Sequence, residues 1–152
     1  MASALVGIGV RWLHVLGMAL VLGGAVLTWG HLRFFADATR TTREQELGGV
    51  WAYEWLFWGS IGILIMTGVG NLGALAPRLP APESSWGMTL SIKLLAILGF
   101  LLLSIIRLLG LHAYGRVSNP APRVRQRLQW GYGLTALYVG GLLVLAEVLA
   151  HG

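Results

Sequence analysis

Residues 11–34 read RWLHVLGMALVLGGAVLTWGHLRF, and this stretch decides the fold class. Between Arg11 and Arg33 no side chain is charged when the two histidines are neutral. A helix needs about 20 apolar residues to cross a hydrocarbon core of roughly 30 Å. The stretch therefore predicts one membrane-spanning helix over about residues 10–34.

The composition of the whole chain agrees with this assignment. Of its 152 residues, 56% are hydrophobic and only 11% are charged, and the mean hydropathy is +0.72. Soluble domains are far more polar. The same counting predicts further spans over about residues 55–75, 87–112 and 129–151. We expect an all-α fold, a single four-helix integral-membrane bundle over residues 1–152, with no soluble domain.

The basic residues predict how the bundle lies in the membrane. Eight of the eleven lysines and arginines follow the first span or come at the end of the third span and beyond it. Cytoplasmic connections carry the excess of basic residues. We therefore predict that both termini are on the non-cytoplasmic side of the cell inner (plasma) membrane. The positive charge then faces anionic lipid headgroups, and nucleic acid is not an expected partner.

The start of the chain and the first connection give two further expectations. The first span is too long for the short apolar core of a cleaved signal peptide, so we expect it to be retained. Segment 36–54, ADATRTTREQELGGVWAYE, is polar and contains a helix start with acidic residues in its first turn. We expect this segment to lie along the inner membrane surface.

Glycines near the middle of the spans allow two interpretations. Small residues let helices approach closely in lipid, so Gly23, Gly24, Gly140 and Gly141 fit helix packing. They also fit a flat cofactor lying against a cleared surface. Gly17 and Gly24 lie on one side of the first span and predict a shallow groove that takes a porphyrin edge.

The polar residues inside the spans form two groups by depth. The chain has no cysteine, so a metal must be held by His, Met, carboxylate or other oxygen donors. His14 and His31 are roughly 25 Å apart along a helix axis and cannot share one metal. The outer group comprises His14, Lys93, Glu147 and His151, with Arg11 beside it, and the inner metal-ligand pair is His31 with His112.

Each group also has a plainer explanation. Lys93 and Arg107 fit the pattern of long cationic side chains that reach to opposite interfaces. Lys93 and Glu147 fit simple charge partners. Ionisable groups at this depth are nonetheless candidate functional residues. His14 is the strongest candidate ligand, because a neutral imidazole binds heme iron or copper and an apolar wall suits a porphyrin.

Two spans resemble a known superfamily. RWLHVLGMALVLGGAVLTWGHLRFFADA and WGMTLSIKLLAILGFLLLSIIRLLGLHAYGR are similar to the small integral-membrane superfamily of copper-resistance protein D domains and HemJ-type protoporphyrinogen oxidases. The TGVGNLGAL segment fits the same pattern. The resemblance rests on a histidine early in the first helix, His14, and a lysine early in the third, Lys93. It implies a bound heme b with His14 as ligand and Lys93 as second ligand or propionate partner.

The sequence is compatible with three functions. The first is a heme b redox protein, an electron carrier or a heme-dependent oxidoreductase, with a quinone or porphyrin as its substrate. The second is copper uptake, with soft donors from His14, Met18, Met66 and Met88. The third is an accessory subunit whose glycine-rich faces pack in a homo-oligomer or in a larger respiratory or photosynthetic membrane complex.

Overall fold

The computed structural model describes residues 2–35, 43–75, 83–116 and 122–151, and all regular structure in these ranges is helical. Helix α1 covers Ala2–Gly30 and continues as a short π-helical segment, η1, over His31–Phe35. Helix α2 covers Arg43–Leu75, α3 covers Ser85–Arg116, and α4 covers Pro122–His151. The predicted all-α bundle of four long helices is confirmed.

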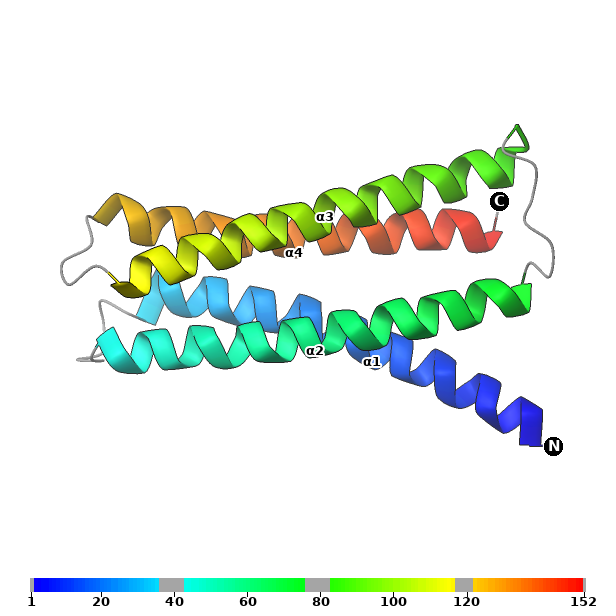
Figure 1. Ribbon diagram of the computed structural model, residues 1–152, viewed down its shortest axis with the longest axis horizontal. Coiled ribbons are helices and arrows are strands. Elements are labelled where there is room, and N and C mark those ends of the chain that lie inside the picture. The colour runs from blue at the N-terminus through cyan, green and yellow to red at the C-terminus, as the bar shows by residue number, and fades with distance from the viewer. Residues whose placement is uncertain (1, 36–42, 76–82, 117–121, 152) are drawn as a thin grey trace.

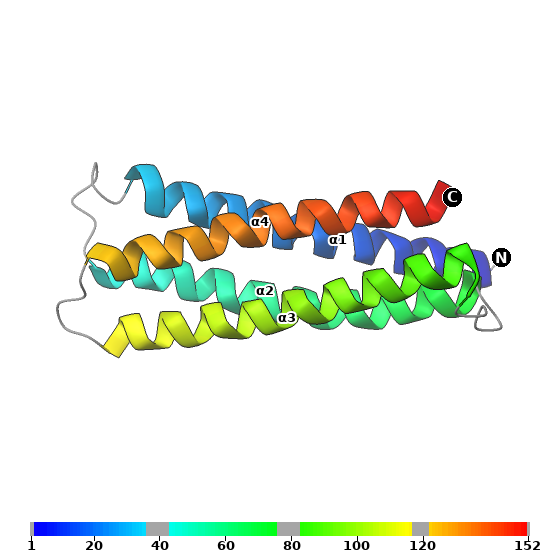
Figure 2. The ribbon, with the colours of Figure 1, turned by 90° about the horizontal axis from the view of Figure 1, so that it is seen from above.

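The helices run alternately up and down, so the chain begins and ends at the same end of the bundle (Figure 1). We call this the terminal end and the opposite one the loop end. The four helices lie roughly parallel when the bundle is seen from above (Figure 2). In the first view, the N-terminal part of α1 diverges from the other helices (Figure 1). Each helix contains a stretch long and apolar enough to cross a membrane, namely Leu5–Phe34, Glu44–Gly70, Ser85–Arg116 and Arg123–Val148.

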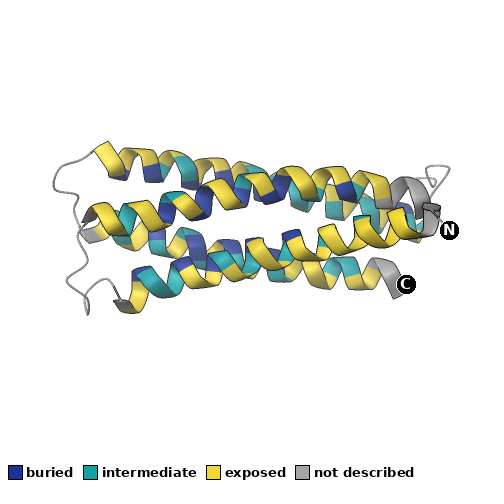
Figure 3. Ribbon diagram, turned by 90° about the horizontal axis from the view of Figure 1, so that it is seen from below, coloured by how far each residue is buried: buried dark blue, intermediate teal, exposed yellow. Residues whose placement is uncertain are grey.

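The surface is apolar while several of the most buried side chains are charged or polar. Trp55, Met66 and Leu137 are 78%, 77% and 75% exposed, whereas Glu54 and Arg107 are 1% and 6% exposed. The exposed residues surround the bundle on its outside (Figure 3). In water this arrangement would expose far more apolar surface than a soluble monomer tolerates. Such a surface is compatible with a multi-pass membrane protein.

The second helix is longer than predicted. It begins at Arg43, so residues 43–54 form its first turns, and the prediction that this segment lies along the membrane surface is wrong for them. Glu44 and Glu46 in the first turn favour a helix start because they complement the helix dipole. Val50 and Tyr53 are buried in the core, which holds these turns in the bundle. Residues 36–42 lie outside the described part of the chain.

The other helices also extend beyond their predicted ends. The first begins at residue 2 rather than about 10, the third covers 85–116 rather than 87–112, and the fourth begins at 122 rather than 129. Counting apolar residues finds only the part of a helix that matches the hydrocarbon thickness. Polar and basic turns such as those around Arg116 and Arg125 continue the same helices past that thickness.

Close packing differs between helix pairs. Helix α1 packs against α2 and α4, and α3 packs against α4. Glycines allow two of these approaches: the Tyr53 ring of α2 covers Gly24 of α1, and the Trp29 indole of α1 covers Gly133 of α4. Helices α2 and α3 are instead joined by large side chains, including the ring contact between Phe57 and Phe100, 5.8 Å between centroids.

Candidate functional site

His14 of α1 forms a hydrogen bond across to α2. Its Nδ1 atom lies 2.8 Å from Oγ1 of Thr67. The Thr67 hydroxyl donates its single hydrogen to backbone carbonyls of its own helix, with the Ile63 oxygen at 2.7 Å and the Leu64 oxygen at 3.3 Å. Thr67 Oγ1 must therefore accept from His14, which assigns the hydrogen of the neutral imidazole to Nδ1.

This assignment leaves the other ring nitrogen as the free donor atom. In the neutral tautomer with hydrogen on Nδ1, Nε2 carries a lone pair. Among the residues that the structure describes, none forms a hydrogen bond with Nε2 of His14. Histidines that bind metals usually donate their second nitrogen to a protein acceptor, which fixes the tautomer and the ring orientation. His14 has that arrangement.

Lys93 of α3 is the predicted outer-group residue whose charge reaches His14. The two residues are close enough for the Lys93 charge to act on the imidazole, and both are half-buried. The other predicted members of the outer group are placed differently. Arg11 and Glu147 are exposed, and the His151 side chain lies outside the described part of the structure. The structure thus joins His14 to Thr67 by a hydrogen bond, and sequence reasoning missed Thr67.

The predicted porphyrin groove on α1 is filled by side chains of α2. A side-chain carbon added at Gly17 would lie 3.1 Å from Leu64, and one added at Gly24 would collide with the ring of Tyr53. Between them, the Val21 carbonyl accepts a hydrogen bond from the Tyr53 hydroxyl at 3.1 Å. These glycines are contact points between α1 and α2, so a porphyrin edge would have to displace Leu64 and Tyr53 to lie there.

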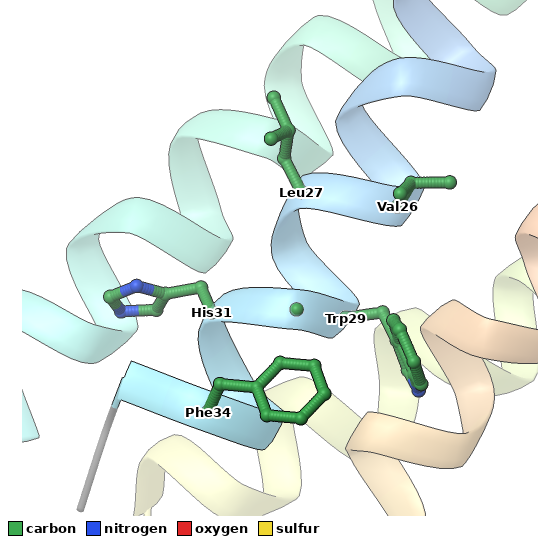
Figure 4. A pocket seen from close by; sticks show the side chains of 6 residues that line it. Val26, Leu27, Trp29, His31 and Phe34 are labelled. Atoms are coloured by element: carbon green, nitrogen blue, oxygen red, sulfur yellow. The ribbon is translucent and has the colours of Figure 1, made fainter. Parts of the chain in front are cut away.

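The two inner histidines face different surroundings. His112 of α3 donates from Nδ1 to the Leu108 carbonyl at 3.1 Å and packs edge-on against Trp51 of α2, with ring centroids 4.7 Å apart. His31 lines a recess on the outside of η1 beside Trp29 and Phe34 (Figure 4). No hydrogen bond or ring contact joins these two described imidazoles, so the inner ligand pair stays a prediction.

The donors proposed for copper also do not converge. Met66 and Met88 are 77% and 59% exposed on the outer surfaces of α2 and α3. Within the described ranges, no three His, Asp or Glu side chains form a group that would hold a metal ion. A metal at His14 would thus take further donors from Lys93 or from a bound group.

A charged cluster that the sequence did not predict lies toward the loop end. Arg107 of α3 donates from Nε to Oε1 of Glu54 at 2.9 Å and from Nη2 to Oε2 at 3.1 Å. Tyr132 of α4 donates to the same Oε1 at 2.7 Å, and Arg107 Nη1 donates to Thr135 at 2.6 Å. We call Glu54, Arg107, Tyr132 and Thr135 the buried ion-pair cluster.

Aromatic rings complete the surroundings of Arg107. The guanidinium carbon lies 4.4 Å from the ring centroid of Phe57, 4.8 Å from that of Tyr132 and 5.7 Å from that of Tyr53. Cation–π contacts of this kind strengthen when water is excluded. The cluster therefore links α2, α3 and α4 through a charge pair whose carboxylate oxygens are both hydrogen-bonded.

The position of Arg107 in the sequence was one indication that this cluster exists. Arg107 lies on the same helical face as Phe100, Ser104, Leu111 and Tyr114, all of which are buried. Spacings of three and four residues place such side chains on one side of a helix. Glu54 gave no comparable signal, because the segment that contains it was assigned to the membrane surface. The cluster lies about 20 Å from Thr67 along α2, counting 67 − 54 = 13 residues.

Comparisons of this chain with protein-family models, curated proteins and solved structures found no match.

Proposed function

We propose that this chain is a heme b-binding membrane redox protein in which Nε2 of His14 is the axial ligand. The observation that carries the proposal is the hydrogen bond from His14 Nδ1 to Thr67, 2.8 Å long, which leaves the Nε2 lone pair available. The resemblance of the first and third helices to heme-associated membrane proteins supports the same residue.

Lys93 has a role in this proposal that follows from its charge. An ammonium group inside a membrane is costly unless an anion or water accompanies it. Within the described residues, no carboxylate forms a salt bridge with Lys93. A heme propionate would supply that anion, and an unprotonated Lys93 would instead supply a second nitrogen ligand. When bound, heme b supplies one-electron transfer, while the chain holds and orients it.

Titration of the purified protein with hemin tests the role of Thr67. Thr67→Val keeps the side-chain shape but removes the acceptor of the His14 hydrogen bond. Loss of such a supporting bond typically lowers metal affinity by about 10- to 100-fold. We expect the hemin affinity, measured from the Soret band, to fall by that amount. Thr89→Val is the matched control, because Thr89 bonds to the Ser85 carbonyl of its own helix and, among the described residues, to no other group. Equal affinities in both variants would contradict the role of Thr67.

We also propose that the loop end faces the cytoplasm of the cell inner membrane. Arg116, Arg123 and Arg127 are exposed at the loop end, and basic residues favour the cytoplasmic side. Because the chain has no cysteine, single cysteines report orientation cleanly. Added side chains at Gly7 and Gly115 meet nothing within 4 Å, and these glycines lie toward opposite ends.

We expect an impermeant maleimide to label Gly7→Cys in spheroplasts, and to label Gly115→Cys only after the membrane is opened. The opposite pattern would show that the orientation is reversed. Labelling of both variants at the same rate before permeabilisation would contradict the four-span topology.

A further inference from the structure

The surface of α1 carries a recess near the loop end. Its volume is about 550 Å³, and it is lined by Val26, Leu27, Trp29, Gly30, His31 and Phe34. The recess is open to the outside of the bundle, and its lining is mostly apolar. In Figure 4 the His31 imidazole and the Trp29 indole project to opposite sides, and the Phe34 ring lies between them.

The backbone around the recess is irregular and anchored. Gly30 is the last α-helical residue before the π-helical segment begins at His31, and a side-chain carbon at Gly30 would meet nothing within 4 Å. Short π-helical segments occur frequently at functional sites. Arg125 of α4 donates from Nη2 to the Leu32 carbonyl and from Nε to Glu46 of α2, both at 3.1 Å. These bonds tie the segment to two other helices.

The walls of the recess favour a neutral, flat ligand. Trp29 and Phe34 pack edge to face, with centroids 5.9 Å apart and an interplanar angle of 87°. Among the described residues, no charged side chain lines the recess. No described residue forms a hydrogen bond with His31 that would occupy its ring nitrogens. An aromatic or quinoid ring packs against such walls, and a carbonyl or hydroxyl on that ring completes a hydrogen bond with imidazole.

The position of the recess restricts the ligand further. Val26, Leu27 and Phe34 are exposed on the outside of the bundle, the surface that would face lipid in a membrane. A ligand thus enters from the lipid phase and leaves an apolar tail beside Val26 and Leu27. On the other side, Trp29 packs against Gly133, the neighbour in sequence of Tyr132 in the buried ion-pair cluster.

We propose that this recess binds the head group of a lipid-soluble quinone, with His31 as the hydrogen-bonding partner of a quinone oxygen. The proposed role of this quinone as electron partner rests on the proposed redox function. Its binding does not require heme. A phospholipid acyl chain is the competing occupant, and it would make no use of the His31 nitrogens.

Photo-cross-linking with an azido-quinone tests the site in the full-length protein in phosphatidylcholine nanodiscs. We expect labelling within residues 26–34 that excess unlabelled quinone suppresses. Gly30→Leu places a side chain in the recess, where an added Cβ atom meets nothing within 4 Å. His31→Ala removes the hydrogen-bonding group. Each change should lower quinone affinity by about tenfold or more. Gly23→Leu is the matched control, because Gly23 is exposed on the same helix and equally free of neighbours.

Each outcome of this experiment supports or contradicts the proposed quinone site in the recess. Loss of protected labelling in Gly30→Leu and His31→Ala but not in Gly23→Leu supports the proposal. Labelling spread over the lipid-facing helices and unaffected by excess quinone would overturn it, as would equal labelling of Gly30→Leu and Gly23→Leu. Heme content is measured in the same samples: protected labelling without heme counts against the proposed function only, and heme without protected labelling counts against the recess only.

Discussion

Arg107→Leu is expected to lower the free energy of unfolding of the bundle by about 3–5 kcal/mol, the usual cost of removing one partner of a buried ion pair. Glu54 would keep its bond to Tyr132, 2.7 Å long, but its carboxylate would lose both bonds from Arg107. Glu54→Leu should cost a similar amount, because it leaves the guanidinium without a counter-ion. Reversible unfolding in mixed micelles, followed by circular dichroism, measures both effects.

The double variant Glu54→Leu/Arg107→Leu separates charge pairing from packing. Replacing both partners leaves no uncompensated charge, so we expect it to be more stable than either single variant. Arg127→Leu is the control, because Arg127 is exposed, and it should change stability by less than about 0.5 kcal/mol. A double variant that loses the sum of the two single losses would show that the residues act independently. Single variants as stable as the control would contradict the cluster's role in holding the bundle.

His14→Ala is expected to abolish heme binding and leave the bundle folded. The side chain is only half-buried, and its one hydrogen bond is to Thr67, so its removal disturbs little packing. Removing the axial nitrogen removes the bond on which the proposed site depends. We expect the Soret band of purified His14→Ala to be absent, while its helical circular dichroism matches that of the unchanged protein.

Two companion variants show whether this loss is specific. Lys93→Ala should weaken heme binding or shift the spectrum, because it removes a propionate partner or second ligand near His14. His31→Ala should leave heme binding intact, because His31 faces the recess on the outside of η1. Loss of heme in His31→Ala with retention in His14→Ala would move the site to the other end of α1.

The four long helices could be predicted because each contains a long stretch of mostly apolar residues. The ends of these helices could not be predicted, because each helix continues through polar turns after its apolar stretch ends. Residues 43–54 show this most clearly. Their many polar residues indicated a segment on the membrane surface, whereas the buried side chains of Val50 and Tyr53 hold the segment in the bundle. These residues lie in the bundle because their apolar side chains face the core, although the segment as a whole is polar.

The candidate site was predictable in part for a related reason. His14 and Lys93 are conspicuous in apolar runs, and counting residues placed them at the same depth. Thr67 and Glu54 are recognised only by partners 53 positions away, at His14 and Arg107 respectively. Such pairings depend on how α2 is rotated and extended beside its neighbours. The glycines of α1 likewise allowed two interpretations until Leu64 and Tyr53 were placed against them.

The central claim, heme b held by His14, is tested most directly by one absorption spectrum. The unchanged protein is produced in heme-sufficient cells, purified in mild detergent and measured before and after reduction by dithionite. The account predicts a Soret band and a reducible b-type α-band, with both features missing from His14→Ala purified in parallel. A folded protein without any porphyrin absorption, or a spectrum unchanged by His14→Ala, would contradict it.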